Sequence, residues 1–127
     1  MRKIIETKNA PAPIGPYSQA VLINNTLYTS GQIAIDPNTG QLNTDSISDE
    51  IQQVMRNLKA VLAAADMDFD AVVKSTIYIT DMDDFTAINS VYGSYFNEAN
   101  APARETVQVA KLPKNVNVEI SVIAIKQ

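Results

Sequence analysis

The sequence contains no cysteine and no histidine among its 127 residues. Without cysteine there is no disulfide, no thiolate nucleophile and no iron–sulfur cluster. Without histidine there is no Ser-His-Asp triad, no imidazole general base and no usual zinc site. Any catalysis must therefore depend on arginine, lysine, carboxylates, hydroxyls or backbone groups.

Long apolar runs, a signal sequence and a surplus of basic residues are also missing. The longest apolar runs span only a few residues, so we expect no helix that crosses a membrane. The N-terminal residues lack the apolar stretch and cleavage site of a signal peptide, so we expect a cytoplasmic protein. The formal net charge of −4 opposes a general electrostatic attraction to nucleic acids or anionic lipids.

The length and composition predict one globular domain over residues 1–127. Hydrophobic residues make up 46% of the chain and charged residues 19%, which is ordinary for a soluble protein. No internal repeat, low-complexity tract or long linker divides the sequence. A chain of this size is long enough for one core but short for two.

The hydrophobic pattern predicts two helices and about six strands. Apolar residues recur at spacings of three and four over 47–65 and 83–97, which is typical of amphipathic helices. The β-branched and alternating segments predict strands over 2–6, 21–23, 26–29, 71–80, 104–110 and 116–126. We expect an α+β fold in which both helices cover one face of a mixed sheet.

The last two predicted strands carry apolar side chains that point to both faces of the sheet. In the segments 105–110 and 117–125, valine and isoleucine occupy alternating and adjacent positions alike. Two helices on one face cannot bury both sets of side chains. A symmetric homo-oligomer that packs sheet against sheet would cover the second face.

Arg104 and Glu119 are the charged residues whose surroundings suggest chemistry. Arg104 lies where a loop enters a strand, and its guanidinium can hold a carboxylate through two hydrogen bonds or form a structural ion pair. Glu119 lies among small and apolar residues. Its carboxylate either faces a cavity, where it can accept a proton or orient a water, or lies on a polar strand face.

Four further positions are candidates for a binding site. Tyr17 ends a proline-rich loop that either holds its ring over a pocket or packs it against the body of the protein. Ser30 and Gly31 end a strand, where the glycine permits either close approach of a ligand or a bulge. Asn89 borders the apolar stripe of the second helix. The acidic residues at 81–84 resemble a cation site, but they fit a helix cap better.

Four segments together resemble the RidA/YjgF family of reactive intermediate deaminases, and the resemblance covers the whole chain. They are NAPAPIGPYSQA at 9–20, TSGQI at 29–33, VVKSTIYITDMDDF at 72–85 and PARETVQVAKLPKNVNVEI at 102–120. The resemblance implies a chorismate-mutase-like α+β layer that assembles as a homotrimer around a central barrel. It also implies sites in clefts between adjacent subunits.

The resemblance further implies hydrolysis of 2-imino acids, chiefly 2-iminobutanoate and 2-iminopropanoate, to 2-oxo acids and ammonia. No metal or cofactor is implied, because an imine carbon is already electrophilic. By similarity Arg104 binds the substrate carboxylate and Glu119 positions the attacking water. The same similarity lines the pocket with Tyr17, Ser30, Gly31, Asn89 and the backbone at Thr106.

Some relatives carry Ser-Cys after the signature arginine, where this chain has Glu105-Thr106. Side chains alternate along a strand, so we expect Glu105 to point away from the pocket. An alternative function is a non-enzymatic protein that uses the same cleft to bind 2-oxo acids or related carboxylates. Ribonuclease and chaperone roles are also attributed to relatives, but the acidic charge and lack of histidine oppose the former.

Overall fold

Six strands form one mixed sheet in a computed structural model that describes residues 1–127. The strands are β1 (Arg2–Ile5), β2 (Ala20–Ile23), β3 (Thr26–Thr29), β4 (Val72–Ile79), β5 (Ala103–Gln108) and β6 (Val118–Ile125). Their order across the sheet is β1-β2-β3-β6-β4-β5. Only β4 and β5 pair in parallel. The last strand, β6, lies between β3 and β4 and pairs antiparallel with both.

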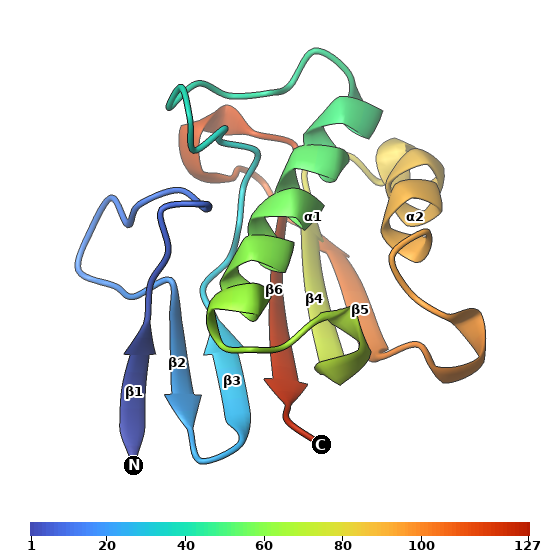
Figure 1. The fold of residues 1–127 in the computed structure, drawn as a ribbon. Coiled ribbons are helices and arrows are strands. Elements are labelled where there is room, and N and C mark those ends of the chain that lie inside the picture. The colour runs from blue at the N-terminus through green and yellow to red at the C-terminus, as the bar shows by residue number, and fades with distance from the viewer.

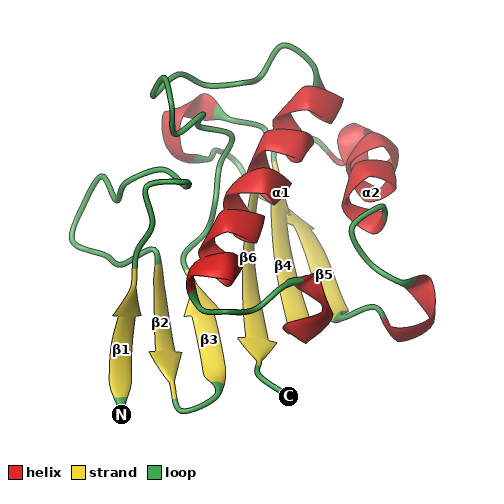
Figure 2. Cartoon of the chain, in the orientation of Figure 1, coloured by secondary structure: helices red, strands yellow, loops and turns green.

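Both helices lie against the same face of this sheet, as Figures 1 and 2 show. Helix α1 (Ile47–Ala64) crosses the sheet, and α2 (Phe85–Gly93) lies beside it over the end that carries β4 and β5. This arrangement confirms the predicted α+β class and the predicted placement of the helices. Neither helix is both long and apolar enough to cross a lipid bilayer.

The sequence explains where α1 begins and why one side of it is buried. The Ser46 hydroxyl accepts a hydrogen bond from the backbone N–H of Asp49 at 3.0 Å, which caps the helix. Acidic side chains occupy the first turn, where the helix dipole favours them. The apolar positions at spacings of three and four are buried and supply much of the core: Ile51, Val54, Met55, Leu58, Val61 and Leu62.

Helix α2 is shorter than the predicted range of 83–97. A 3-10 turn over Met82–Asp84 precedes it, and the Asp81 carboxylate accepts the Asp83 N–H at 2.9 Å. The helix ends at Gly93 because glycine and serine are poor helix formers, and the Ser94 hydroxyl donates to a carbonyl of the last turn. The aromatic residues beyond it continue the apolar pattern but pack against the core from a turn.

Alternation along β6 separates the two faces of the sheet. Four side chains are buried beneath the helices: Val118, Ile120, Val122 and Ala124. The intervening side chains point to the face that no helix covers. That face also exposes large apolar side chains at Ile125, the last residue of β6, and on other strands at Ile4, Ile23, Tyr28 and Val107. The prediction of apolar residues on both faces is thereby confirmed, while the homotrimer stays a prediction.

Truncation of Leu58 tests the packing of α1 on the sheet. Leu58 is fully buried, so Leu58→Ala should lower the free energy of unfolding by about 2–5 kcal/mol. Urea denaturation followed by circular dichroism at a fixed protein concentration measures the change. The adjacent exposed Lys59→Ala is the matched control and should stay within about 0.5 kcal/mol. Equal effects of the two substitutions would contradict this packing.

Candidate functional site

Helix α2 and strand β5 hold Arg104 in a cradle of aromatic and amide groups. The Arg104 guanidinium donates a hydrogen bond to Asn89 Oδ1 at 2.6 Å. The Cζ atom of the guanidinium lies 5.5 Å from the ring centre of Phe85 and 5.3 Å from that of Tyr92, within cation–π range. We call these four residues the arginine cradle. Arg104 and Asn89 are both predicted site residues, and the structure brings these two together.

Tyr92 anchors the arginine cradle to the core. Its hydroxyl donates to Ser75 Oγ at 2.9 Å, and Ser75 is fully buried opposite Arg104 in the β4–β5 register. Burial raises the pKa of the Tyr92 phenol, although the Ser75 hydrogen bond and the Arg104 charge oppose the shift. The phenol therefore stays neutral at physiological pH and supports Arg104 as an aromatic face.

The guanidinium retains hydrogen-bonding capacity toward a ligand. It has five N–H donors, and its single hydrogen bond within the chain goes to Asn89. It borders a surface cavity of about 600 Å³ whose other lining residues are Asn89, Tyr92, Gly93, Phe96, Glu98, Ala101 and Pro102. A planar cation with free parallel donors beside a cavity is suited to a bidentate carboxylate.

Glu119 lies in a second cavity, of about 380 Å³, which we call the glutamate pocket. Three of its lining residues are the predicted Tyr17, Ser30 and Gly31. The remainder come from the proline-rich loop, the segment after β3 and the turn before β6: Pro11, Ala12, Ile14, Gln32, Ile33, Ile35 and Pro113. Burial raises the pKa of the Glu119 carboxyl, which favours its protonated form at higher pH than usual.

Gly31 makes room for the Glu119 side chain. A Cβ atom at position 31 would lie 2.7 Å from Glu119 Cδ, closer than side-chain atoms tolerate. The sequence interpretation was that this glycine permits either close approach of a ligand or a bulge. In the structure a group does approach it closely, but that group is the Glu119 carboxyl of the same chain. Any larger residue at position 31 would displace Glu119 from its place in the pocket.

Arg104 and Glu119 lie on opposite faces of the sheet. On β4, Ser75 is paired with Arg104 and Tyr78 with Glu119, and positions 75 and 78 point to opposite sides. Arg104 thus faces the helix layer, and Glu119 faces away from it. The two cavities share no lining residue. One chain therefore brings the predicted residues together as two separate groups.

Thr106 belongs to neither cavity lining. It lies two residues after Arg104 on β5, so its side chain points to the same face of the sheet. Its hydroxyl oxygen is buried and makes no hydrogen bond within the chain. The structure places Thr106 beneath the helix layer near the arginine cradle, and its predicted backbone contact with substrate stays a prediction.

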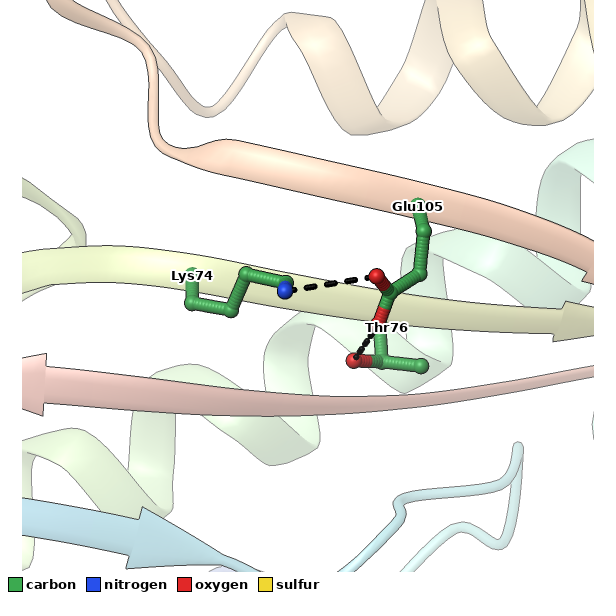
Figure 3. Close-up of polar contacts among 3 residues, drawn as sticks. All are labelled: Lys74, Thr76 and Glu105. Carbon is green, nitrogen blue, oxygen red and sulfur yellow. Dashed lines mark hydrogen bonds and ion pairs between the residues drawn. The ribbon is translucent and has the colours of Figure 1, made fainter.

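Glu105 points to the helix-free face, as expected. Figure 3 shows its carboxylate between two residues of β4. Lys74 Nζ lies 3.3 Å from one carboxylate oxygen, and the Thr76 hydroxyl donates to the other at 3.0 Å. The Thr76 hydrogen bond, followed by the Lys74 interaction, lowers the pKa of the Glu105 carboxyl. Glu105 therefore neither contacts Arg104 nor competes for its donors.

The sequence interpretation did not assign Phe85 and Tyr92 to the site. Both are among the apolar residues whose spacing predicts a helix over 83–97. Their spacing from Asn89 is four and three residues, which puts all three on one side of α2. That shared side is a signal present in the sequence, but only the fold shows that it faces Arg104 on β5.

The mixed six-stranded sheet, covered by two helices on one face and bordered by the arginine cradle and the glutamate pocket, places the chain in a class of small α+β proteins. The family model described as Endoribonuclease L-PSP matches residues 7–126. The chain belongs to this family, which is the RidA/YjgF family that its motifs resemble.

Individual relatives agree in sequence and in fold. A RutC family protein from Pyrococcus horikoshii is 49% identical, with all of both chains covered. A 2-iminobutanoate/2-iminopropanoate deaminase from Rattus norvegicus is 48% identical over 99% of this chain and 91% of the relative. The crystal structure of a Rid family protein from Yersinia pestis has a TM-score of 0.96 at 48% identity, covering 99% of this chain and 100% of that one.

The raised pKa of Glu119 predicts a pH-dependent effect of Glu119→Gln on stability. In the folded chain the Glu119 carboxyl keeps its proton at pH values above its ordinary pKa of 4.5. The free energy of unfolding therefore falls as pH rises through the folded pKa. Glutamine does not titrate. The variant should therefore gain stability relative to the wild type as pH rises from about 4 to 7.

Urea denaturation of both proteins across this pH range measures the difference. Glu6→Gln, which removes an exposed carboxyl elsewhere, is the matched control. A difference between Glu119→Gln and wild type that is independent of pH would contradict the assigned environment of Glu119.

Proposed function

We propose that the protein hydrolyses small 2-imino acids, such as 2-iminobutanoate and 2-iminopropanoate, to 2-oxo acids and ammonia. The observation that carries the proposal is that the fold presents both a cation suited to bind a carboxylate and a carboxyl suited to exchange protons with water. Arg104 offers free donors to a carboxylate, and Glu119 is a half-buried carboxyl with a raised pKa. The deaminase names of the mammalian relatives support the same reaction.

We infer that the working site forms between adjacent subunits of a homotrimer. Within one chain the arginine cradle and the glutamate pocket are on opposite sides of the sheet. A 2-imino acid is far too small to contact both groups across a sheet. In a ring of subunits, the arginine cradle of one copy meets the glutamate pocket of the next, and the exposed apolar side chains of the helix-free face become covered.

The proposed roles follow from charge and position. The guanidinium of Arg104 binds the substrate carboxylate through parallel hydrogen bonds, while Asn89 and the two aromatic rings fix its plane. Tyr17, Ser30 and Gly31 line the wall around Glu119, and the Thr106 backbone completes the cradle side. These contacts orient the substrate so that its imine carbon lies beside Glu119.

The chemistry then needs one water and a series of proton transfers through Glu119. Ionised Glu119 accepts a proton from water as the water oxygen bonds to the protonated imine carbon. This gives a carbinolamine, whose nitrogen takes up that proton. As the carbon–nitrogen bond breaks, Glu119 takes the hydroxyl proton and the oxygen becomes the carbonyl of the 2-oxo acid. The departing ammonia then takes this proton from Glu119 and leaves as ammonium, which returns Glu119 to its ionised form. Burial of Glu119 favours the proton uptake in the first step.

Removal of the Arg104 guanidinium should abolish imine hydrolysis. Arg104→Ala loses two charge-assisted hydrogen bonds to substrate, so kcat/KM should fall at least about 100-fold. Arg104→Lys should be intermediate, because an ammonium keeps the charge without the planar pair of donors. In the assay a threonine dehydratase generates 2-iminobutanoate, and semicarbazide traps whatever remains unhydrolysed.

Arg56→Ala, which removes an exposed arginine from α1, is the matched control and should retain activity. A fully active Arg104→Ala protein would contradict the role of Arg104. If the wild type hydrolyses no small imino acid but binds 2-oxo acids, the carboxylate-binding function replaces the deaminase. Cleavage of RNA by the wild type, lost in Arg104→Ala, would favour an endoribonuclease instead.

Mixed oligomers test the shared site. Arg104→Ala and Glu119→Gln subunits should each be inactive alone, but a co-expressed 1:1 mixture should recover about one quarter of wild-type activity. Each site then draws an intact Arg104 from one subunit and an intact Glu119 from its neighbour. Arg104→Ala mixed with the Arg104→Ala/Glu119→Gln double variant is the control and should stay inactive. Hetero-oligomers that form without recovery would rule out a shared site.

A further inference from the structure

Glu50 is a fully buried carboxylate that the proposed chemistry does not use. It lies in the first turn of α1 and reaches the start of β6. Its Oε2 accepts the backbone N–H groups of Asn117 at 2.7 Å and Val118 at 3.1 Å. Its Oε1 accepts the side-chain amide of Asn117 at 2.7 Å. One side chain thus satisfies two consecutive backbone donors where no neighbouring strand does so.

These hydrogen bonds end one residue before Glu119. On its other side, Ile120 exchanges backbone hydrogen bonds with Gln32: the Gln32 N–H donates at 2.8 Å and the Ile120 N–H at 3.1 Å. Gln32 follows Gly31, whose surface the Glu119 side chain covers. The backbone of Glu119 is therefore fixed from both sides, by α1 before it and by the segment after β3 beyond it.

We propose that Glu50 is the positioning residue that holds Glu119 in place for the reaction. This inference rests on the proposed role of Glu119. Glu50 does not touch the glutamate pocket, so it acts only through the backbone of residues 117 and 118. Without an acceptor from α1, two buried N–H groups would lack partners, and the start of β6 would move to reach water. The Glu119 carboxyl would move with it.

Two substitutions separate the hydrogen bonds from the volume of the side chain. Glu50→Gln keeps a carbonyl for the two backbone donors, and the Asn117 amide can turn over so that its oxygen accepts from the new amide. Glu50→Met has similar length but accepts none of the three hydrogen bonds. The glutamine variant should therefore preserve the position of Glu119, and the methionine variant should lose it.

Kinetics at a temperature where every variant is folded by circular dichroism provide the first test. Glu50→Met should lower kcat about 10- to 100-fold with KM within about twofold, because misplacement of Glu119 leaves the arginine cradle intact. Glu50→Gln should stay within about threefold of wild type in kcat. Leu62→Ala, an equally buried truncation on the same helix, is the control and should lower thermal stability without changing kcat.

Amide hydrogen exchange measured by NMR tests the positioning independently of activity. Exchange at Asn117, Val118 and Glu119 should accelerate at least about tenfold in Glu50→Met but not in Glu50→Gln or Leu62→Ala. If the methionine variant fails to fold, Asn117→Ala replaces it. This change removes one of the three hydrogen bonds and should lower kcat about threefold with KM unchanged.

The outcomes separate this inference from the proposed function. An inactive wild type whose exchange pattern follows Glu50 overturns the deaminase and, with it, the catalytic purpose of the positioning. An active wild type that loses kcat in Glu119→Gln but not in Glu50→Met overturns the role of Glu50 alone. Equal losses of kcat in Glu50→Met and Leu62→Ala also overturn it, because they would show a general structural effect.

Discussion

Alternation of side chains across the central strands is the constraint on which the site depends. Because Ser75 and Tyr78 of β4 point to opposite faces, their partners Arg104 and Glu119 do so as well. The strand geometry leaves no freedom to bring the two charges together by a side-chain rotation. A chemistry that needs both groups therefore needs a second copy of the chain, so the proposed catalysis and the proposed assembly become one requirement.

The same separation gives each group its own electrostatic environment. The Arg104 guanidinium lies over two aromatic rings, while the carboxyl of Glu119 is half-buried without a nearby cation in its own chain. An arginine in the same pocket would lower the pKa of Glu119 and oppose the effect of burial. In the proposed assembly the arginine comes from the neighbouring subunit, and the carboxylate of a bound substrate neutralises part of its positive charge.

Much of the fold and part of the candidate site were predictable from the sequence. The features that were not predictable were missed for physical reasons. The hydrophobic periodicity located α1 and the strands, and alternation placed Glu105 away from Arg104. The length of α2 was wrong because aromatic residues beyond Gly93 extend the apolar pattern without extending the helix. The fit of Gly31 against Glu119 and the support of Arg104 by α2 depend on contacts between distant segments, which local patterns do not report.

Buried polar residues of α1 connect the helix to both walls of the glutamate pocket. Glu50 binds the start of β6, and Asn57, two turns later, donates to the carbonyls of Ile33 and Ile35 at 3.0 and 2.9 Å. Isolated polar groups at these positions would destabilise the core, but each finds partners in backbone that no strand satisfies. The helix thereby determines the shape of a pocket it does not line. The apolar face of α1 stabilises the fold, and its polar positions set the geometry of the site.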